Sequence, residues 1–358
     1  MKIIVVQDYL RSGGTERQSL RLARAFHEAG HATTLITFRP GGALEVGETP
    51  RLALQPFDLG LDWFAPGLSA AARRLAPDIV LCMGRMANCY AGRLQKALPA
   101  AAVVATLRTG KPLPWLFRRS LLRVRHVIAN SREARQNLLA WYGMPPGLVS
   151  VIPNPLLFPP VARDAAVRAR FWASESTTVL LSVAMFRPEK NQRELVEIVA
   201  GMPAELDWQL WLAGDGPARA SCERLARARG LKDRVKFLGL WPDPRPLYAA
   251  ADVAVHASWS ESHSNFLSEA QAHGLPAVAS TAQGIRECFI PGETGWEGPA
   301  GDRAGFIAAL ARLIAEPPEL RAARSKKAAA FALQAFDPAR QTRAHLELFE
   351  SLVRVART

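Results

Sequence analysis

The chain has 358 residues, of which 49% are hydrophobic and 22% are charged, and its formal net charge at pH 7 is +13. This length exceeds one hydrophobic core and predicts about two domains, while the ordinary composition excludes disordered and low-complexity proteins. No apolar run approaches the roughly 18 residues of a membrane span, and the start lacks a signal-peptide pattern, so a soluble cytosolic enzyme is expected.

Short apolar runs alternate with segments of helical period through the first half of the chain. The predicted strands are 3–6, 32–37, 79–82, 103–107 and 124–129, and the predicted helices are 15–29, 67–75, 87–97 and 116–122. Such alternation predicts an α/β domain with a doubly wound, mostly parallel sheet.

A pair of glycines, Gly13 and Gly14, follows the first predicted strand and opens the first helix. Glycine permits close backbone approach, and a helix N-terminus offers unpaired N–H groups to an anion. The pair therefore predicts an anion site at this loop. Arg17 either joins that site or is an ordinary surface side chain.

The positive charge is concentrated in the first half. Residues 1–165 contain 21 Lys and Arg against 10 Asp and Glu, whereas residues 166–358 contain 24 against 22. A basic surface attracts nucleic acid, anionic lipid or a phosphorylated acceptor, but compositional drift explains the excess equally well. Residues 115–125 mix apolar and basic side chains, which fits a membrane-surface helix or an ordinary amphipathic helix, and we favour the second.

A proline-rich stretch over residues 150–160 has no helical period and predicts the crossover between two domains. A second series of strands is predicted at 179–183, 209–213, 235–238, 253–255 and 276–280. The tail from about residue 338 to residue 355 has apolar residues at helical spacing.

Two cations, Arg187 and Lys190, follow the first strand of this second series. As an isolated pair they would be ordinary surface charges. At the carboxyl end of a parallel strand they are placed to bracket a pyrophosphate, the arginine as a fork and the lysine as a point charge.

Two carboxylates, Glu261 and Glu269, lie eight positions apart between two buried strands. Eight residues of helix would turn the second carboxylate only about 80° from the first, so both would address one ligand. The order of strand, loop, helix and strand predicts a βαβ unit, whose ligand edge lies at the carboxyl ends of its strands. A nucleotide sugar suits this pair, with one acid for the sugar and one for the ribose.

These motifs occur in an order that resembles retaining glycosyltransferases of family 4, which have the GT-B fold. The Gly-Gly loop comes first, then a helix entry at Ser131, the Pro-Asn crossover, the Arg/Lys pair and the spaced Glu pair. Order across several motifs is more specific than any one match. The resemblance implies two Rossmann-like doubly wound domains facing across a cleft, with a C-terminal helix that crosses back to the first domain. The expected domains are 1–160 with 338–358 for the acceptor, and 161–337 for the nucleotide-sugar donor.

The resemblance also implies roles for individual residues. Arg187 and Lys190 would stabilise the departing diphosphate in place of a metal ion, so no metal or cofactor is expected. Glu261 would hold hydroxyls of the transferred sugar and Glu269 those of the ribose. The remaining implied donor-binding residues are Gly13, Gly14, Leu240, Ser264, Asn265, Phe266 and Leu267. Trp241 either touches the base or packs, whereas the glycines of Gly214-Asp-Gly216-Pro217 shape a tight turn.

The chain departs from the family pattern at two places. Relatives commonly have Glu-Gly-Phe-Gly where this chain has Glu261-Ser-His-Ser, which puts His263 near the sugar, where it would alter donor choice. Many relatives have a histidine at the end of the strand that here leads into Arg108. Either Arg108 acts electrostatically on donor or acceptor, which we favour and which makes it a catalytic candidate, or catalysis is impaired.

The implied function is transfer of a hexose-type sugar from a UDP- or GDP-linked donor, with retention, to a glycan acceptor that is lipid-linked. This reaction would serve cell-envelope polysaccharide or lipopolysaccharide synthesis in the cytoplasm or at the inner membrane face. One alternative is a nucleotide-sugar epimerase on the same fold, and another is a catalytically silent glycan- or nucleotide-binding partner subunit. No RNA-module signature is present, which argues against a nucleic-acid partner. The four cysteines and seven histidines lack metal-ligand spacing.

Overall fold

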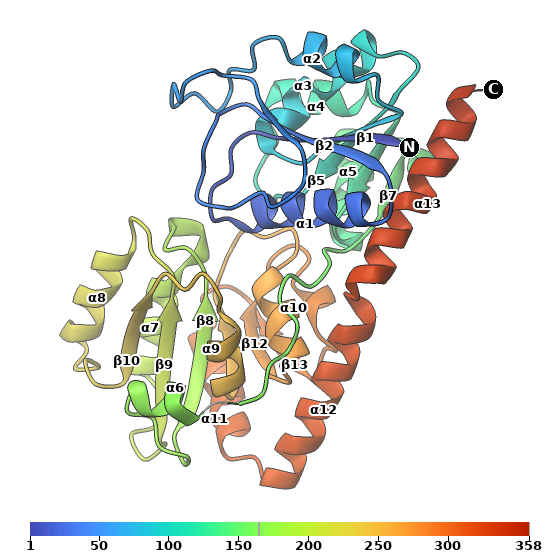
Figure 1. The fold of residues 1–358 in the computed structure, drawn as a ribbon. Coiled ribbons are helices and arrows are strands. Elements are labelled where there is room, and N and C mark those ends of the chain that lie inside the picture. Colours follow the sequence, from blue (N-terminus) through green and yellow to red (C-terminus); the bar gives the residue numbers. More distant parts are fainter. Residues whose placement is uncertain (164, 358) are drawn as a thin grey trace. The chain divides into compact units, whose positions relative to one another are not determined.

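The computed structural model describes residues 1–163 and 165–357. The chain forms two compact units (Figure 1): unit 1 comprises Met1–Leu157 and the C-terminal segment from Pro338, and unit 2 comprises Phe158–Asp337. The chain passes from unit 1 to unit 2 after Leu157, slightly before the boundary at residue 160 that the sequence predicts. No helix among the described residues is long and apolar enough to cross a membrane.

Unit 1 is built on a seven-stranded parallel sheet with the order β3-β2-β1-β4-β5-β6-β7. Its strands are β1 (Lys2–Gln7), β2 (Ala32–Thr37), β3 (Arg51–Ala53), β4 (Ile79–Cys82), β5 (Ala102–Leu107), β6 (His126–Ala129) and β7 (Val149–Val151). Its helices are α1 (Gly14–Glu28), α2 (Leu68–Leu75), α3 (Arg85–Ala97), α4 (Trp115–Leu121), α5 (Arg132–Tyr142), η1 (Pro146–Leu148) and α13 (Pro338–Arg357). The edge strands β3 and β7 were not predicted, because three residues are too few for a periodic signal.

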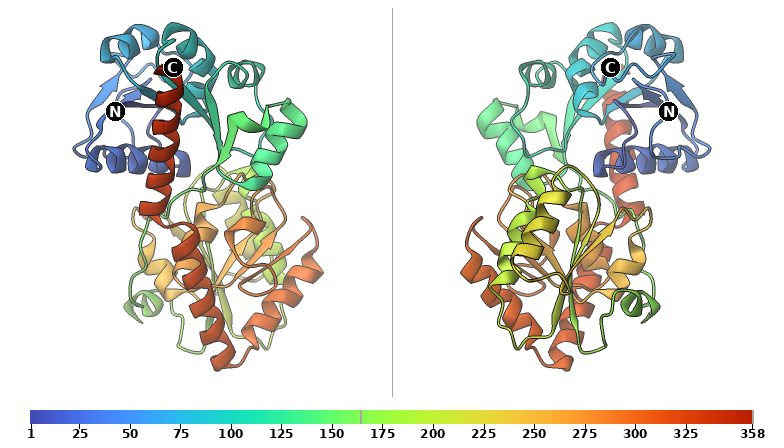
Figure 2. Two further views of the ribbon diagram at one scale, coloured as in Figure 1. Left: turned by 90° about the vertical axis from the view of Figure 1, so that its right-hand side faces the viewer. Right: turned by 90° about the vertical axis from the view of Figure 1, so that its left-hand side faces the viewer.

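Helices cover both faces of this sheet. Apolar residues of α2, α3, α4 and α5 form a core on one face. On the other face, α13 crosses α1 and packs against it (Figures 1 and 2), and the rings of Phe26 and Phe349 meet edge to face at 5.5 Å. The C-terminal helix therefore belongs to unit 1, which confirms the expectation that it crosses back to the first domain.

Unit 2 has a six-stranded parallel sheet with the order β10-β9-β8-β11-β12-β13. Its strands are β8 (Thr178–Val183), β9 (Trp208–Ala213), β10 (Val235–Gly239), β11 (Val253–His256), β12 (Ala277–Ser280) and β13 (Gly295–Gly298). Its helices are α6 (Ala165–Arg170), η2 (Pro188–Lys190), α7 (Gln192–Ala200), α8 (Arg219–Ala228), α9 (Arg245–Ala250), α10 (Asn265–Ala272), η3 (Arg286–Cys288), α11 (Arg303–Ile314) and α12 (Pro318–Ala335). The strand order reverses between β8 and β11. In such sheets ligands bind outside the carboxyl ends of the strands at this reversal.

Two cores fill unit 2, one on each face of its sheet. Helices α7, α8 and α11 cover one face, and α9 and α10 cover the other. Trp208 and Trp211, on β9, point to opposite faces because side chains alternate along a strand, and both are almost completely buried.

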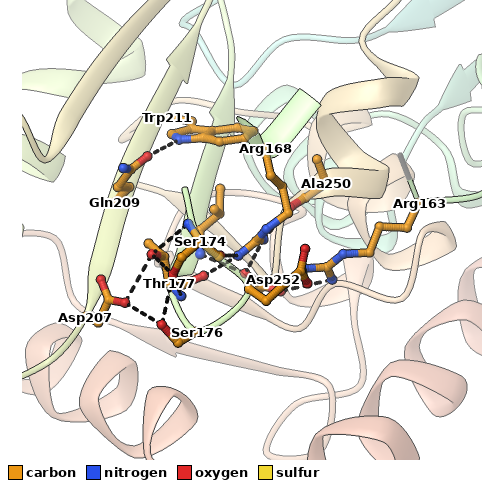
Figure 3. Close-up of polar contacts among 12 residues, drawn as sticks. Arg163, Arg168, Ser174, Ser176, Thr177, Asp207, Gln209, Trp211, Ala250 and Asp252 are labelled. Carbon is orange, nitrogen blue, oxygen red and sulfur yellow. Dashed lines mark hydrogen bonds and ion pairs between the residues drawn. The ribbon is translucent and has the colours of Figure 1, made fainter. Parts of the chain in front are cut away.

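A buried guanidinium fixes the amino ends of β8 and β11 (Figure 3). Arg168 is 1% exposed and donates to the carbonyl of Ala250 at 2.8 Å, to the carbonyl of Ser174 at 2.6 Å and to the carboxylate of Asp252 at 3.0 Å. The same carboxylate accepts the backbone N–H of Val179 at 2.8 Å. Because a buried charge needs such pairing, this network is a structural clamp at the edge opposite to the expected ligand edge.

Candidate functional site

The candidate site of unit 2 lies where β8 ends. The loop after β8 is joined to the loop after β9, since the N–H of Ala184 donates to Ala213 and the N–H of Phe186 donates to Asp215. Gly214 has φ +135°, and a Cβ there would overlap the carbonyl oxygen of Ala184. Only glycine allows both this conformation and this approach. The glycine turn is therefore structural, as predicted, and it fixes the start of the segment that carries the two cations.

Arg187 and Lys190 lie at the two ends of one 3-10 turn. Arg187 is the N-cap of η2, and its carbonyl accepts the N–H of Lys190 at 3.0 Å. The ammonium group of Lys190 forms an ion pair with the carboxylate of Glu261. The structure thus joins the predicted phosphate cation to the predicted sugar carboxylate at the β8–β11 reversal.

Glu261 is held in an ionised form. It lies on the loop after β11 and is 9% exposed. Its Oε1 atom contacts both Lys190 and the ring Nε2 of His256, the latter at 3.1 Å. Burial raises the pKa of Glu261, but the charge of Lys190 and the hydrogen bond from His256 outweigh it and lower the pKa to about 2.

Only one of the two spaced carboxylates lies on a helix. Helix α10 begins at Asn265, so Glu269 is helical and Glu261 is not. The argument from helical angle was therefore wrong, because the turn from β11 into α10 separates the two residues. What relates them is the common carboxyl edge of the sheet.

A stack of rings connects the two carboxylates. The phenol of Tyr248 donates to Glu269 at 2.6 Å. Its ring stacks with Phe266 at 6.1 Å, and Phe266 in turn stacks with His256 at 6.3 Å and 13°. His256 contacts Glu261, so one continuous set of side chains from α9, β11 and α10 positions both acids.

The first turn of α10 offers mainly backbone groups to a ligand. Ser264 is its N-cap, and the Ser264 hydroxyl accepts the N–H of Leu267 at 3.3 Å. The side chains of Phe266 and Leu267 are buried. Asn265, the first helical residue, is partly exposed. A phosphate at this turn would meet the positive end of the helix rather than these side chains.

One aliphatic and one aromatic residue, Leu240 and Trp241, follow β10. Leu240 is 58% exposed and lies directly after the strand. Trp241 donates its indole N–H to the carbonyl of Leu238 at 3.2 Å and packs against Phe171. Of its two interpretations, packing is the one that the contacts support.

His263, which the sequence predicts to lie near the sugar, is buried in unit 2, as Glu261 is. It is 7% exposed, its Nε2 lies 3.0 Å from the hydroxyl of Ser268, and its Nδ1 lies 3.7 Å from the sulfur of Cys288. Its ring also meets Phe336 edge to face at 5.1 Å. The loop after β11 therefore buries both Glu261 and His263, and the position of His263 relative to a sugar stays a prediction.

In unit 1, the Gly-Gly loop forms the start of α1. Gly13 is the N-cap and has φ −78°, an ordinary conformation for any residue. A Cβ on Gly13 would meet the carboxylate of Glu16, which is the mobile end of a flexible side chain, so neither space nor backbone conformation requires glycine at this position. Gly14 is the first helical residue. The helix start thus holds an acidic side chain where an anion was predicted.

Arg108 follows β5 and donates to the side-chain oxygen of Asn154. Its Nε and Nη2 atoms are buried, and neither has a hydrogen-bond partner among the residues that the structure describes. Burial lowers the pKa of Arg108 to about 10. A buried guanidinium with unused donors has the chemistry to receive an anionic group.

Side chains able to bind a metal do not gather anywhere in residues 1–163 and 165–357: no group of three or more His, Cys, Asp or Glu is found. Two functional candidates, His256 and Tyr248, were missed from the sequence. The available signal was a polar residue that ends a buried strand, in the case of His256, and nothing in the sequence distinguished Tyr248.

Comparisons with known proteins cover both units. Residues 12–156 match the family described as Glycosyltransferase Family 4, and residues 177–316 match Glycosyl transferases group 1. The chain belongs to glycosyltransferase family 4. This glycosyltransferase is 29% identical over 322 residues to the lipopolysaccharide core biosynthesis glycosyltransferase LpsE of Rhizobium meliloti, which covers 86% of this chain and 87% of LpsE. It is 27% identical to LpsD of the same organism, over 94% of this chain and 95% of LpsD.

A solved structure shares the fold of this glycosyltransferase. HepE of Anabaena, determined in complex with UDP, has a TM-score of 0.84 at 22% identity and covers 98% of this chain and 100% of its own. Together with the two parallel sheets, this likeness confirms the predicted GT-B fold.

Proposed function

We propose that this glycosyltransferase transfers a hexose-type sugar from a UDP- or GDP-linked donor to a glycan acceptor, with retention of configuration. The observation that carries the proposal is the contact of Lys190 and His256 with Glu261 at the β8–β11 reversal of unit 2. It combines a cation suited to a diphosphate with an ionised carboxylate suited to sugar hydroxyls.

The reaction assigns a task to each group. The bond between the anomeric carbon and the diphosphate oxygen breaks, and Arg187 and Lys190 stabilise the charge that develops on the departing diphosphate. The acceptor oxygen bonds to the same face of that carbon, and its proton passes to the diphosphate. Glu261 accepts hydrogen bonds from the sugar, and Glu269 accepts them from the ribose. No metal or other cofactor is assigned.

The relatives support the choice of donor and acceptor. HepE is described in complex with UDP-glucose, which supports a UDP-linked hexose as donor. LpsE and LpsD act in lipopolysaccharide core biosynthesis, which supports a lipid-linked glycan of the cell envelope as acceptor. Such an acceptor would be met on the cytoplasmic face of the membrane.

The surface of unit 1 supports peripheral contact with an anionic membrane. Residues 79–132 contain ten Lys and Arg and no Asp or Glu. On and beside α4, Trp115 is 64% exposed, Leu116 53% and Leu122 61%. Exposed apolar side chains among arginines are suited to an interface of anionic lipid headgroups. No nucleic-acid partner is proposed.

Arg108 is assigned an electrostatic role on an anionic group of donor or acceptor. Two of its nitrogen atoms are buried without partners in the described chain, and an anionic ligand would satisfy them. Of the two interpretations of Arg108 at the position of the family histidine, this assignment adopts the one in which Arg108 takes part in catalysis.

A donor screen tests the proposal. Thermal unfolding is measured with UDP-, GDP- and ADP-sugars, and a donor that binds only the folded protein raises the midpoint. We expect a UDP- or GDP-sugar to do so, and Glu261→Ala and Arg187→Ala to abolish donor hydrolysis or transfer. Undiminished activity in both variants would refute the assignment. Conversion of the donor to its epimer without acceptor would favour an epimerase. Binding of the donor without turnover would favour a catalytically silent subunit.

A further inference from the structure

The ammonium group of Lys190 has two partners, one in the ligand-free structure and one in the proposed reaction. In the ligand-free structure its ammonium group pairs with the carboxylate of Glu261. In the proposed reaction the same ammonium group binds the diphosphate. One ammonium group that moves toward a phosphate weakens its contact with the carboxylate, so Glu261 would lose its cation as the donor arrives.

A buried carboxylate does not tolerate that loss without a second partner. Glu261 is 9% exposed, and breaking a buried ion pair by removal of one member is strongly destabilising, because the other charge stays buried and unpaired. Donor binding would then have to offset the cost of an isolated carboxylate. A hydrogen-bond donor that stays in place lowers this cost.

His256 is such a donor. Its ring is 4% exposed, and its Nε2 lies 3.1 Å from Oε1 of Glu261, the oxygen that also contacts Lys190. The ring has little room to turn away, because it is buried and lies nearly parallel to the ring of Phe266, at 13°.

The hydrogen-bond pattern also indicates which ring nitrogen carries the proton. The other nitrogen, Nδ1, is buried and has no partner among the described residues. A neutral ring with its proton on Nε2 donates to Glu261 and leaves only a lone pair at Nδ1, whereas a charged ring would bury an unpaired N–H. A neutral donor can remain beside Glu261 without competing with the diphosphate for Lys190.

We propose that His256 is a positioning residue that keeps Glu261 ionised and oriented while Lys190 shifts from Glu261 to the donor diphosphate. This inference rests on the proposed function and deepens it. It adds the hydrogen-bond donor that stabilises the buried carboxylate of Glu261 when Lys190 moves to the diphosphate. His256 acts through Glu261 and need not touch the donor.

Calorimetric titration with UDP tests the inference in a double-mutant cycle. His256→Leu is expected to weaken UDP binding about tenfold when Glu261 is present, the loss of one hydrogen bond to a charged group. In the Glu261→Gln background the same change should cost less than about twofold, because an uncharged amide depends less on a hydrogen bond from His256 once Lys190 has moved to the diphosphate. His256→Gln, which can place an N–H near the position of Nε2, should bind within about threefold of the wild type.

Equal losses in the two backgrounds would show a packing role and overturn the inference, as would no loss in either. If His256→Leu does not fold, the comparison of His256→Gln with His256→Asn replaces it, because asparagine is too short to reach Glu261. If the wild type binds UDP and His256→Leu binds it equally well, this inference alone is contradicted. A wild-type protein that binds no UDP, GDP or ADP contradicts the proposed function, and the inference with it.

Discussion

Glu261 should make the stability of unit 2 depend on pH. The pKa of this carboxyl is about 2 in the folded protein against an ordinary value of 4.5. A folded-state pKa below the unfolded one stabilises the fold above the unfolded pKa, and this stabilisation is lost as pH falls toward the folded pKa. A difference of about 2.5 units corresponds to about 3 kcal/mol at pH 7, of which less than about half should remain at pH 3.

Urea unfolding followed by tryptophan fluorescence measures this contribution. Trp208 and Trp211 of unit 2 are buried, whereas Trp63, Trp115 and Trp141 of unit 1 are more than half exposed, so the change in emission reports mainly on unit 2. The wild type and Glu261→Gln are compared from pH 7 to pH 3, with Glu205→Gln at an exposed position of the same unit as control.

We expect Glu261→Gln to be less stable than the wild type at pH 7 and the difference to shrink as pH falls. The variant is less stable because it removes the carboxylate that Lys190 and His256 contact. The difference shrinks because protonation at low pH removes the same charge from the wild type. A difference in the free energy of unfolding that is the same at pH 7 and pH 3 would refute the reasoning, because it would mean that Glu261 titrates alike in the folded and unfolded chains.

Three further outcomes follow from the structure. Arg168→Met should destabilise unit 2 by about 3 kcal/mol, because it leaves buried carbonyls without a donor and removes one of the partners of Asp252. The folded protein should still bind UDP normally; weakened binding would contradict the placement of this clamp at the opposite sheet edge. Gly214→Ala should cost about 2 kcal/mol or more and weaken UDP binding, because its Cβ would displace Ala184 and the loop that leads to the cations; unchanged binding would contradict this coupling. Trp115→Ser should lower cosedimentation with anionic phospholipid vesicles severalfold, which corresponds to a loss of about 1 kcal/mol of interface binding. The similarly exposed control Trp141→Ser should not lower it; equal effects of the two variants would exclude α4 as the membrane contact.

The fold could be predicted because its signals are repeated along the chain. Each long central strand is an apolar run followed by a helical period, and the order of the motifs identified the family. The edge strands β3, β7 and β13, which have only three or four residues, carry too short a signal. Their place in the sheets depends on neighbours that are distant in sequence.

The site could be predicted only at the level of residue types. Lys190 and Glu261 were identified because each follows a buried strand, and the structure brings them into contact. His256 was not identified, because its role depends on a stack that Phe266 makes with residues of two other elements. The contact of His263 with Cys288 likewise depends on packing that no local pattern encodes.

A crystal structure of the protein with bound UDP tests the central claim most directly. The account predicts the diphosphate at the β8–β11 edge of unit 2, with Lys190 on a phosphate oxygen, Glu269 on the ribose and His256 still on Glu261. A nucleotide bound elsewhere, with the ion pair of Lys190 and Glu261 intact, would contradict it.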